Sequence, residues 1–317
     1  TQYCWGRSVN LRVFTTLKAG GNPDALYIER DLMSLESRVC ALQSAGEKTT
    51  VLGWGSNVLP SDDGVPGTVI INETKAISIQ GETLLADSGA GFQDVFLAAA
   101  QSSLGGLEFA VGIPGTLGGA LVSNAGAYRS EVSKYLTRIR VAFDGKVEWK
   151  DPAWMEFSYR DSILRRPDPV QAVITQVELR LPFREPKFIY DDARDYQRQR
   201  IGKQPPSASA GSFFKNVIDA ELAQKIPGLT QGMRDNHVIP AGFLIEACGL
   251  KGYRIGGAMI GKRHANFLLN VGGATARELR SVAVFASRMV QERFGVSLEE
   301  EVLYLGDWTR FKPIVSV

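Results

Sequence analysis

A glycine-rich loop in the first quarter of the chain has the residue types that bind a phosphate group. The segment VLGWGSNVLP (residues 51–60) places Gly53 and Gly55 directly after an expected strand. Glycine accepts backbone angles that other residues avoid, so the N–H groups of such a loop can approach a pyrophosphate closely. Val58 stands where a dinucleotide-binding fingerprint has its third glycine, and no helical pattern follows. Taken alone, the loop is interpreted equally well as a plain β-turn.

A second glycine cluster is denser and indicates a large, flat ligand. Residues 106–128, GLEFAVGIPGTLGGALVSNAGAY, include glycines at positions 112, 115, 118, 119 and 126. Structural glycines usually spread over turns, whereas this segment is continuous, dense in glycine and apolar. Such a composition favours a surface that lies against a ligand. A smaller element, GAGF at residues 89–92, is better interpreted as a tight turn from a strand into a helix.

Arg160 and Ser212 have side chains that could act on a bound ligand. Arg160 keeps its charge and can stabilise an anionic intermediate through fixed hydrogen bonds. Ser212 follows Gly211 and precedes two phenylalanines, so its hydroxyl can be exposed on a tight turn beside apolar walls. Residue type alone favours simpler roles for both: a surface ion pair of Arg160 with Asp161, and an ordinary turn serine at position 212.

The composition is that of a globular enzyme with two or three modest domains. The chain has 317 residues, 44% hydrophobic and 22% charged, with a formal net charge of +2. This charge gives no argument for a nucleic-acid partner. The N-terminal sequence lacks the apolar stretch of a signal peptide, and no apolar run is long enough to span a membrane. We therefore expect a cytoplasmic protein without nucleic-acid or membrane partners.

The cysteines and histidines exclude other classes of site. Cys4, Cys40 and Cys248 are an odd number, far apart and without a CxxC pair, so we expect neither a disulfide framework nor a metal site. A reducing compartment is the simplest interpretation. His237 and His264 are too few and too isolated to indicate a hydrolase triad.

The elements that position the loops can be predicted from residue spacing. We expect a βαβ unit that runs into the first glycine loop, with Asp31 as the N-cap of its helix. Asp144-Gly145 predicts a hairpin, and Thr275 with Glu278 predicts a capping box. The amino-acid composition becomes polar and charged after Pro182. We therefore expect a surface helix there and a domain boundary near residue 185. The predicted strands are 25–29, 49–52, 69–72, 77–79, 84–88 and 173–181, and the predicted helices begin at residues 32, 92, 241 and 275.

An ordered set of motifs resembles the UDP-N-acetylenolpyruvoylglucosamine reductases, the MurB family. The match runs from about Phe14 to Gly306. One motif would be weak evidence, but the full set in the right order and spacing is strong. The motifs are FTTLKAGGNPD (14–24), GWGSN (53–57), GLEFAVGIPGTLGGA (106–120), NAGAY (124–128), FSYRDS (157–162), SAGSFFKN (209–216), GLKG (249–252), IGGA (255–258), HANF (264–267) and LEEEV (298–302).

The resemblance implies a fold class and a division of labour. The fold is α+β, with an FAD-binding region of two subdomains of the vanillyl-alcohol-oxidase (PCMH-like, FAD-binding type 2) kind. A C-terminal α+β domain binds the substrate. The implied ranges are 1–75 and 76–185 for the two FAD-binding subdomains and 186–317 for the substrate domain. The short passage from FSYRDS to SAGSFFKN resembles the shorter, second type of the family.

The resemblance also implies the reaction and the ligands. A chain of this family reduces the enolpyruvyl ether of UDP-N-acetylglucosamine enolpyruvate to UDP-N-acetylmuramate, a precursor of peptidoglycan. FAD, expected to be bound non-covalently, carries the reducing equivalents that NADPH supplies. The expected partners are the UDP-sugar and NADPH alone, and we expect a monomer. Two alternatives stay open: another FAD oxidoreductase of this fold acting on a sugar or a hydroxy acid, and a non-catalytic flavin-binding paralogue.

Site residues carry over motif by motif. Arg160 would stabilise the enolate, Ser212 would donate the proton to C2, and Glu301 would orient or assist that donor. The expected FAD-binding residues are Gly53, Trp54, Gly55, Ser56, Asn57, Gly112, Ile113, Pro114, Gly115, Thr116, Gly118, Gly119, Asn124 and Ala127. The expected substrate-binding residues are Tyr159, Arg200, Lys203, Asn216, Lys251 and His264.

The sequence departs from the family pattern at two places. Val217 stands where the family usually has Pro after FFKN, and LEEEV replaces the more usual LEPEV, so Glu300 occupies the usual proline position. Counting back from Val302 assigns Glu301 as the acting residue. Without this register, a solvated acid in an acidic run would be the simpler interpretation of Glu301.

Overall fold

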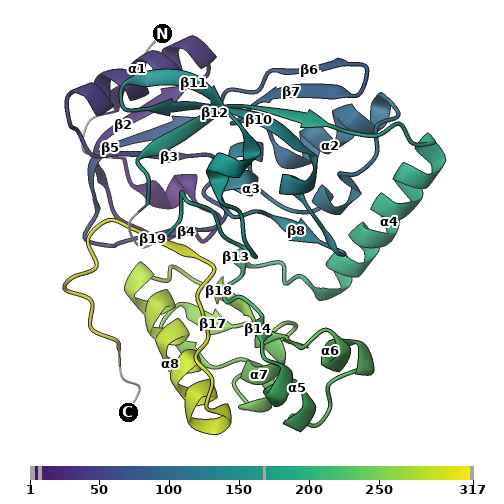
Figure 1. Cartoon of the computed structure of the whole chain (residues 1–317). Helices are drawn as coiled ribbons and strands as arrows, with labels where there is room; N and C mark the ends of the chain where they lie inside the picture. Colours follow the sequence, from purple (N-terminus) through teal and green to yellow (C-terminus); the bar gives the residue numbers. More distant parts are fainter. Residues whose placement is uncertain (1–3, 6–8, 167–168, 315–317) are drawn as a thin grey trace. The chain divides into compact units, whose positions relative to one another are not determined.

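The computed structural model describes residues 4–5, 9–166 and 169–314, which divide into two compact units (Figure 1). Unit 1 combines Thr1–Val9, Pro23–Gly55 and Pro66–Gly202. Unit 2 combines Asn10–Asn22, Ser56–Val65 and Lys203–Val317. Each unit is therefore assembled from segments that are far apart in the sequence.

Unit 1 is built on two main sheets. The first has the strand order β1-β2-β5-β3, with β3 and β5 parallel, and the second has the order β11-β10-β12-β7-β6 with every neighbouring pair antiparallel. A two-stranded ribbon, β8-β9, begins at the end of the second glycine cluster. The strands are β1 (Cys4–Trp5), β2 (Pro23–Glu29), β3 (Thr49–Leu52), β5 (Val65–Asn72), β6 (Ile77–Gln80), β7 (Thr83–Asp87), β8 (Gly126–Ala127), β9 (Ser130–Glu131), β10 (Leu136–Phe143), β11 (Lys146–Lys150) and β12 (Ala172–Arg180).

Helices join and cover these sheets. Helix α1 (Leu32–Ser44) lies between them, because its Leu35 and Val39 pack in one cluster with Ile70 of β5 and Ala142 of β10. The larger core lies against the five-stranded sheet and receives the apolar faces of three further helices. These are α2 (Phe92–Gln101), α3 (Leu117–Val122) and α4 (Pro186–Lys203), with short 3-10 helices at Glu108–Ala110, Val132–Tyr135 and Pro152–Met155.

Unit 2 has its own core around a long helix. Helix α8 buries Leu279, Val282 and Val290 in a cluster that includes α7 and the sheet β13-β18-β17-β16. Smaller pairs are the antiparallel β14-β15 and the parallel β4-β19. The elements are η1 (Leu11–Phe14), β4 (Val58–Pro60), β13 (Ala208–Ser212), β14 (Val217–Ile218), α5 (Ala220–Lys225), α6 (Gln231–Asp235), β15 (Val238–Ile239), α7 (Ala241–Ala247), β16 (Arg254–Ile255), β17 (Ala258–Ile260), β18 (Phe267–Asn270), α8 (Ala276–Phe294) and β19 (Leu303–Leu305).

Most predicted local signals are confirmed. The Asp31 side chain accepts a hydrogen bond from the Ser34 N–H at 2.9 Å and caps α1. Phe143 and Lys146 flank the Asp144-Gly145 turn of the β10-β11 hairpin. Residues 89–91 form a tight connection from β7 into α2, as expected for GAGF.

The predicted boundary near residue 185 differs from the division that the structure shows. Helix α4 continues to Lys203, and its Ile189 and Ala193 are buried in the core of unit 1. The polar surface of this helix gave it the composition of a linker, whereas a narrow apolar stripe attaches it to the preceding sheet. Residues 10–22 and 56–65, predicted as parts of the first subdomain, pack with unit 2.

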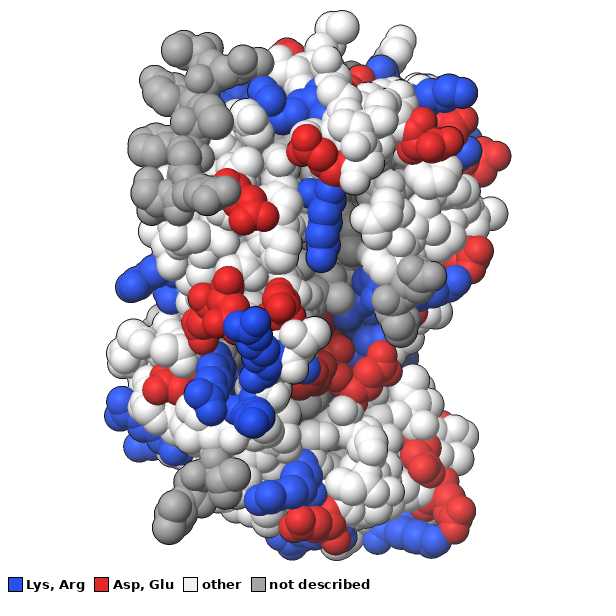
Figure 2. All heavy atoms as spheres, turned by 90° about the vertical axis from the view of Figure 1, so that its left-hand side faces the viewer, with Lys and Arg blue, Asp and Glu red and all other residues white. Residues whose placement is uncertain are grey.

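The surface carries charges of both signs. On the face drawn in Figure 2, acidic and basic side chains are interspersed, in line with the small net charge. Within the described residues, no helix has the combined length and apolar composition needed to cross a bilayer.

The capping box of α8 gives a direct stability prediction. The Thr275 hydroxyl accepts the Glu278 N–H at 3.1 Å, and the Glu278 carboxylate accepts the Thr275 N–H at 3.1 Å. Thr275→Ala should therefore lower the free energy of unfolding by about 1 kcal/mol, whereas Thr275→Ser keeps the acceptor and should stay close to the parent. Urea titration followed by circular dichroism measures the difference. Equal stability of all three proteins would contradict the prediction.

Candidate functional site

The predicted glycine loops converge in unit 1. A Cβ built on Gly53 would lie 2.4 Å from Oγ1 and 2.6 Å from Cγ2 of Thr116, so the first loop lies directly against the second. A Cβ on Gly91 would lie 3.0 Å from the Trp54 ring, which brings the GAGF turn to the same place. These contacts leave no space for side chains. The Trp54 side chain itself is 50% exposed and lies at the edge of this cluster.

Main-chain hydrogen bonds fasten the second loop to the turn between β7 and α2. The N–H groups of Leu117 and Gly118 donate to the carbonyls of Ala90 and Ser88, both at 2.8 Å, and the Phe92 N–H donates to the Gly115 carbonyl at 2.9 Å. Gly112 and Gly115 have φ values of 73° and 134°, which side-chain-bearing residues rarely adopt. The cluster of glycines is thus required by both close packing and backbone conformation.

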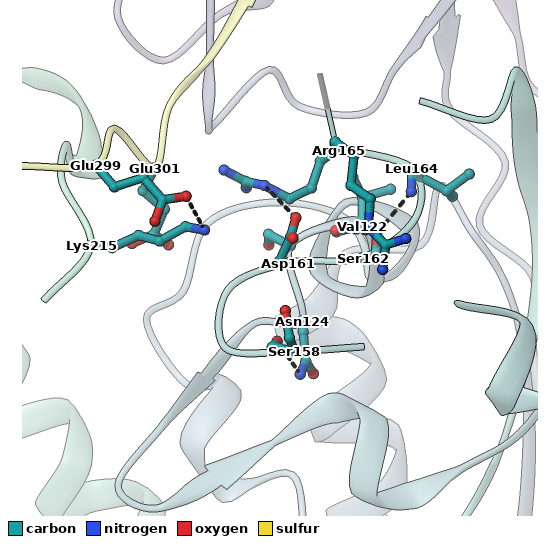
Figure 3. Close-up of polar contacts among 12 residues, drawn as sticks. Val122, Asn124, Ser158, Asp161, Ser162, Leu164, Arg165, Lys215, Glu299 and Glu301 are labelled. Carbon is teal, nitrogen blue, oxygen red and sulfur yellow. Dashed lines mark hydrogen bonds and ion pairs between the residues drawn. The ribbon is translucent and has the colours of Figure 1, made fainter. Parts of the chain in front are cut away.

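Arg160 is held by the NAGAY segment. Its Nη1 donates to the Asn124 carbonyl at 3.2 Å, and its Nη2 donates to the Gly126 carbonyl. The Asn124 amide in turn donates to the Ser158 carbonyl at 3.1 Å (Figure 3). Asn124 and Arg160 both have positive φ, at 42° and 54°. Such strained backbone persists only where surrounding contacts determine it, and it is concentrated at ligand sites.

The ion pair that the structure shows for Asp161 is with Arg165. Asp161 lies 3.6 Å from the Nε of Arg165, four residues further along the chain (Figure 3). The Arg165 side chain is 4% exposed, so this pair is largely removed from solvent. Arg160 points instead to the carbonyls of the loop that follows α3.

Arg200 lies beside the same loop in unit 1. Its guanidinium lies 5.6 Å from the ring centroid of Tyr128, which stacks on Tyr196 at 3.8 Å, and its Nη2 donates to the Phe109 carbonyl at 3.2 Å. Burial is the largest cause that lowers the pKa of Arg200, and the nearby charge of Arg160 lowers it further. Two guanidinium groups in one electrostatic environment favour an anionic ligand.

Ser212 lies at the end of β13 in unit 2, on a turn that Asn266 fixes. Gly211 has a φ of 76°, and the Phe213 N–H donates to the Asn266 carbonyl at 2.7 Å. The Asn266 side chain also accepts the Phe214 N–H at 3.0 Å and donates to the Phe214 carbonyl at 2.8 Å. Sequence reasoning missed this role of Asn266, although its place in the HANF motif was a signal.

The acidic run pairs with the residues that follow Ser212. The Glu301 N–H donates to the Phe213 carbonyl at 2.7 Å, and the Lys215 N–H donates to the Glu299 carbonyl at 2.8 Å. The Lys215 ammonium also lies 2.6 Å from the Glu299 carboxylate (Figure 3). This register brings the main chain of Glu301 next to that of Ser212.

Asn57, expected to bind the cofactor, contacts the acidic run within unit 2. Its side-chain amide donates to the Glu301 carbonyl at 3.0 Å, and its own carbonyl accepts the Leu303 N–H at 3.0 Å. The GWGSN loop therefore passes from unit 1, which contains Gly53, into unit 2. Directly after this loop, β4 pairs in parallel with β19, the strand that follows the acidic run.

Two expected substrate-binding residues, Lys203 and Lys251, lie within electrostatic reach of a third, His264, in unit 2. Burial, followed by the charges of Lys203 and Lys251, holds the pKa of His264 below its ordinary value. Lys251 also pairs with Glu246 at 2.6 Å. His264 Nδ1 accepts the Asn266 N–H at 3.2 Å, so it is part of the structure that supports Ser212.

The remaining expected contacts have different surroundings. Asn216 accepts the Ala241 N–H at 3.3 Å and so supports the start of α7. Tyr159 is 41% exposed, with the Arg160 guanidinium 5.1 Å from its ring centroid, in unit 1. Val217 is the first residue of β14 and is registered with Ile239.

Comparisons with known proteins match two parts of the chain to domain families. Residues 23–149 match an FAD binding domain, and residues 203–305 match the C-terminal domain of UDP-N-acetylenolpyruvoylglucosamine reductase. The reductase of Thermotoga petrophila is 36% identical over 294 residues, 92% of this chain and 95% of the relative. The reductase of Bacillus subtilis is 34% identical over 296 residues, 92% of this chain and 91% of the relative.

A solved structure extends the likeness to three dimensions. The crystal structure of UDP-N-acetylenolpyruvylglucosamine reductase (MurB) from Thermus caldophilus matches with a TM-score of 0.75 and 31% identity, and the match covers 96% of this chain and all of that one. The fold and the glycine loops define an α+β flavoprotein with an FAD-binding region and a separate C-terminal domain. The chain belongs to the UDP-N-acetylenolpyruvoylglucosamine reductase (MurB) family.

The close contact of Gly53 with Thr116 can be tested directly. Gly53→Ala would place a methyl group 2.4 Å from a hydroxyl oxygen, so the two loops must separate, and the FAD content of the purified protein should fall strongly. Gly232→Ala is the matched control, because a Cβ there meets nothing within 4 Å. The ratio of flavin to protein absorbance measures the loss. Full FAD content in Gly53→Ala would show that the loops can separate without affecting the cofactor.

Proposed function

We propose that this protein reduces the enolpyruvyl ether of UDP-N-acetylglucosamine enolpyruvate to UDP-N-acetylmuramate, a step of peptidoglycan precursor synthesis. FAD, bound without a covalent link, would mediate the reaction, and NADPH would be the reductant. The observation that carries the proposal is the hydrogen bond from the Glu301 N–H to the Phe213 carbonyl. It aligns the acid that the family register selects with the turn that presents Ser212.

The residues of unit 1 are compatible with a bound flavin. Asn124 Oδ1 is buried and finds no hydrogen-bond partner among the described residues, and it belongs to a loop dense in glycine. Gly53, Gly55, Gly112, Gly115 and their neighbours would hold the cofactor, since their N–H groups can approach phosphate and ring oxygens closely. When bound, FAD supplies hydride chemistry that no side chain provides.

The side chains divide the remaining work. Addition of hydride to C3 of the enolpyruvyl group leaves electrons on C2 and the carboxylate, and Arg160 would stabilise this charge. The two carbonyls that orient its guanidinium fix the position of the charge before the substrate arrives. Ser212 would then deliver a proton to C2. Glu301 would orient the serine hydroxyl or balance charge beside it.

The UDP part would meet the basic and polar residues. In unit 2, Lys203, Lys251 and His264 share one electrostatic environment, which suits a diphosphate, and Asn216 would contact the sugar. In unit 1, Tyr159 and Arg200 would complete substrate binding, because an anionic neighbour stabilises the partly buried guanidinium of Arg200, whose pKa is lowered by burial.

We further propose that the protein acts as a monomer on small molecules in a reducing cytoplasm. Cys40 and Cys248 are free thiols, which is compatible with a reducing compartment.

Anaerobic rapid mixing tests the proposed reaction. NADPH should bleach the yellow protein, and UDP-N-acetylglucosamine enolpyruvate should restore the colour without oxygen. An oxidase of the same fold would be reoxidised by oxygen but not by the sugar. A non-catalytic paralogue would respond to neither NADPH nor the sugar.

Arg160→Ala should affect one half-reaction. Loss of the guanidinium should cost on the order of 3 kcal/mol of transition-state stabilisation in flavin reoxidation by the sugar, as for removal of an oxyanion-hole donor. Flavin reduction by NADPH should change much less. Arg166→Ala is the matched control, because Arg166 forms a surface pair with Glu156. Equal loss in both half-reactions would assign Arg160 to cofactor binding or folding.

Ser212→Ala should separate the half-reactions further. The substitution removes the proposed proton donor and hardly changes the volume, so reoxidation by the sugar should slow by roughly 10² to 10⁴. Flavin reduction should stay near the parental rate, and Ser212→Cys should recover part of the loss. Ser209→Ala, on the same strand, is the control. Normal reoxidation by Ser212→Ala would assign proton delivery to another group.

A further inference from the structure

Glu300 is held by a network that reaches α8 and the C-terminal segment of unit 2. The Tyr304 hydroxyl donates to Glu300 Oε1 at 2.7 Å. Tyr304 is four residues further along the chain and lies in the strand β19. This bond occupies the carboxylate of the residue that directly precedes Glu301. The neighbour on the other side, Glu299, is occupied by Lys215.

Arg280 of α8 supports Tyr304 through a cage of aromatic rings. Its guanidinium carbon lies 4.4 Å from the ring centroid of Tyr304, 4.7 Å from that of Trp308 and 4.3 Å from that of Phe311. Its Nε and Nη1 are buried and have no hydrogen-bond partner within the described part of the chain. Attraction between the cation and the ring faces therefore contributes to holding this guanidinium in place.

The network stabilises a carboxylate that is otherwise poorly solvated. Burial raises the pKa of Glu300, while the Tyr304 hydrogen bond and the charge of Arg280 act in the opposite direction. The same burial and the proximity of Glu300 raise the pKa of Tyr304, so the phenol stays protonated and remains a donor. Removing Tyr304 or Arg280 would leave the part-buried Glu300 carboxylate without that compensation. This costs more than removing the partner together with the carboxylate.

In the pairing of residues 213–215 with residues 299–301, the main chain of Glu300 makes no hydrogen bond. Phe214 and Glu300 form a non-hydrogen-bonded pair, because the bonds on either side of it join Lys215 to Glu299 and Glu301 to Phe213. The side chain is thus the anchor at this position. A proline, which lacks an N–H, can occupy such a position without losing a bond of this pairing.

We propose that Tyr304 and Arg280 are positioning residues that act through Glu300 to fix the segment carrying Glu301. The proposal rests on the proposed function, since it concerns how Glu301 is oriented toward Ser212. It also implies that the network compensates for the acid at position 300. With proline at position 300, the Tyr304 hydroxyl would have no carboxylate to which it could donate a hydrogen bond.

A double-mutant cycle tests this dependence on the FAD-loaded enzyme. Tyr304→Phe keeps the ring that contacts Arg280 and removes the hydroxyl, which donates to Glu300 and also forms a hydrogen bond with Arg280. Reoxidation of the reduced flavin by UDP-N-acetylglucosamine enolpyruvate should slow about tenfold, the rate equivalent of one hydrogen bond. FAD content and flavin reduction by NADPH should stay at the parental values. In a Glu300→Pro background, the same substitution should change reoxidation less than about twofold.

Further variants separate positioning from general damage. Arg280→Lys keeps the charge but loses the flat guanidinium, and it should slow reoxidation in the parental background more than in Glu300→Pro. Tyr190→Phe, an equal change on the exposed surface of α4, should have no effect. Glu301→Gln should be slow in both backgrounds, because it removes the group that the network positions.

The outcomes distinguish the two proposals. Parental reoxidation by Tyr304→Phe, or an equal loss in both backgrounds, would overturn the positioning role while Glu301→Gln remains slow. A parental enzyme that the sugar does not reoxidise would overturn the proposed function and this inference with it. If Tyr304→Phe loses FAD, or if its flavin reduction slows as much as its reoxidation, Tyr304 would have a role in the fold instead.

Discussion

The pairing between residues 213–215 and 299–301 is the interaction on which the candidate site depends. Its two hydrogen bonds, Glu301 N–H to Phe213 and Lys215 N–H to Glu299, join the end of the chain to the turn that carries Ser212. Asn266 fixes the other side of that turn with three further bonds. Because each bond involves main-chain atoms, a shift by one residue would replace Glu301 with a neighbouring acid. Three consecutive glutamates make this register the decisive feature.

Close packing plays the corresponding part in unit 1. Gly53 lies against Thr116 and Gly91 against Trp54, so these contacts leave no room for a side chain at either glycine. The strained backbone of Asn124 and Arg160 lies in the segments that follow. Strained, closely packed loops cost free energy to fold, and under the proposed function they would provide a preorganised site for an extended, anionic cofactor.

Local signals were the part of the structure that the sequence could predict. The helix of the first crossover, the hairpin at Asp144-Gly145 and the capping box of α8 each depend on residues a few positions apart. The motif also selected Glu301 by its distance from Val302, and this assignment stays a prediction. Long-range contacts have no such signature, and the Arg280 cage and the Asn57 bond to Glu301 appear only once the chain is folded.

Helix α4 shows why domain boundaries were harder to predict. Its mean character is polar, and only Ile189 and Ala193 along its length are buried, so composition indicated a linker. Those two side chains nevertheless attach it to unit 1, and Arg200 near its end lies beside Tyr128 of the same unit. A residue predicted within the substrate domain therefore belongs to the unit that carries the second glycine loop.

Analysis of the product tests the central claim most directly. One equivalent of NADPH-reduced enzyme should be mixed anaerobically with UDP-N-acetylglucosamine enolpyruvate, and the nucleotide sugar analysed by mass spectrometry after one turnover. The account predicts one equivalent of UDP-N-acetylmuramate per flavin, heavier than the substrate by two hydrogen atoms. Recovery of the unchanged enolpyruvyl ether beside reduced flavin would contradict it.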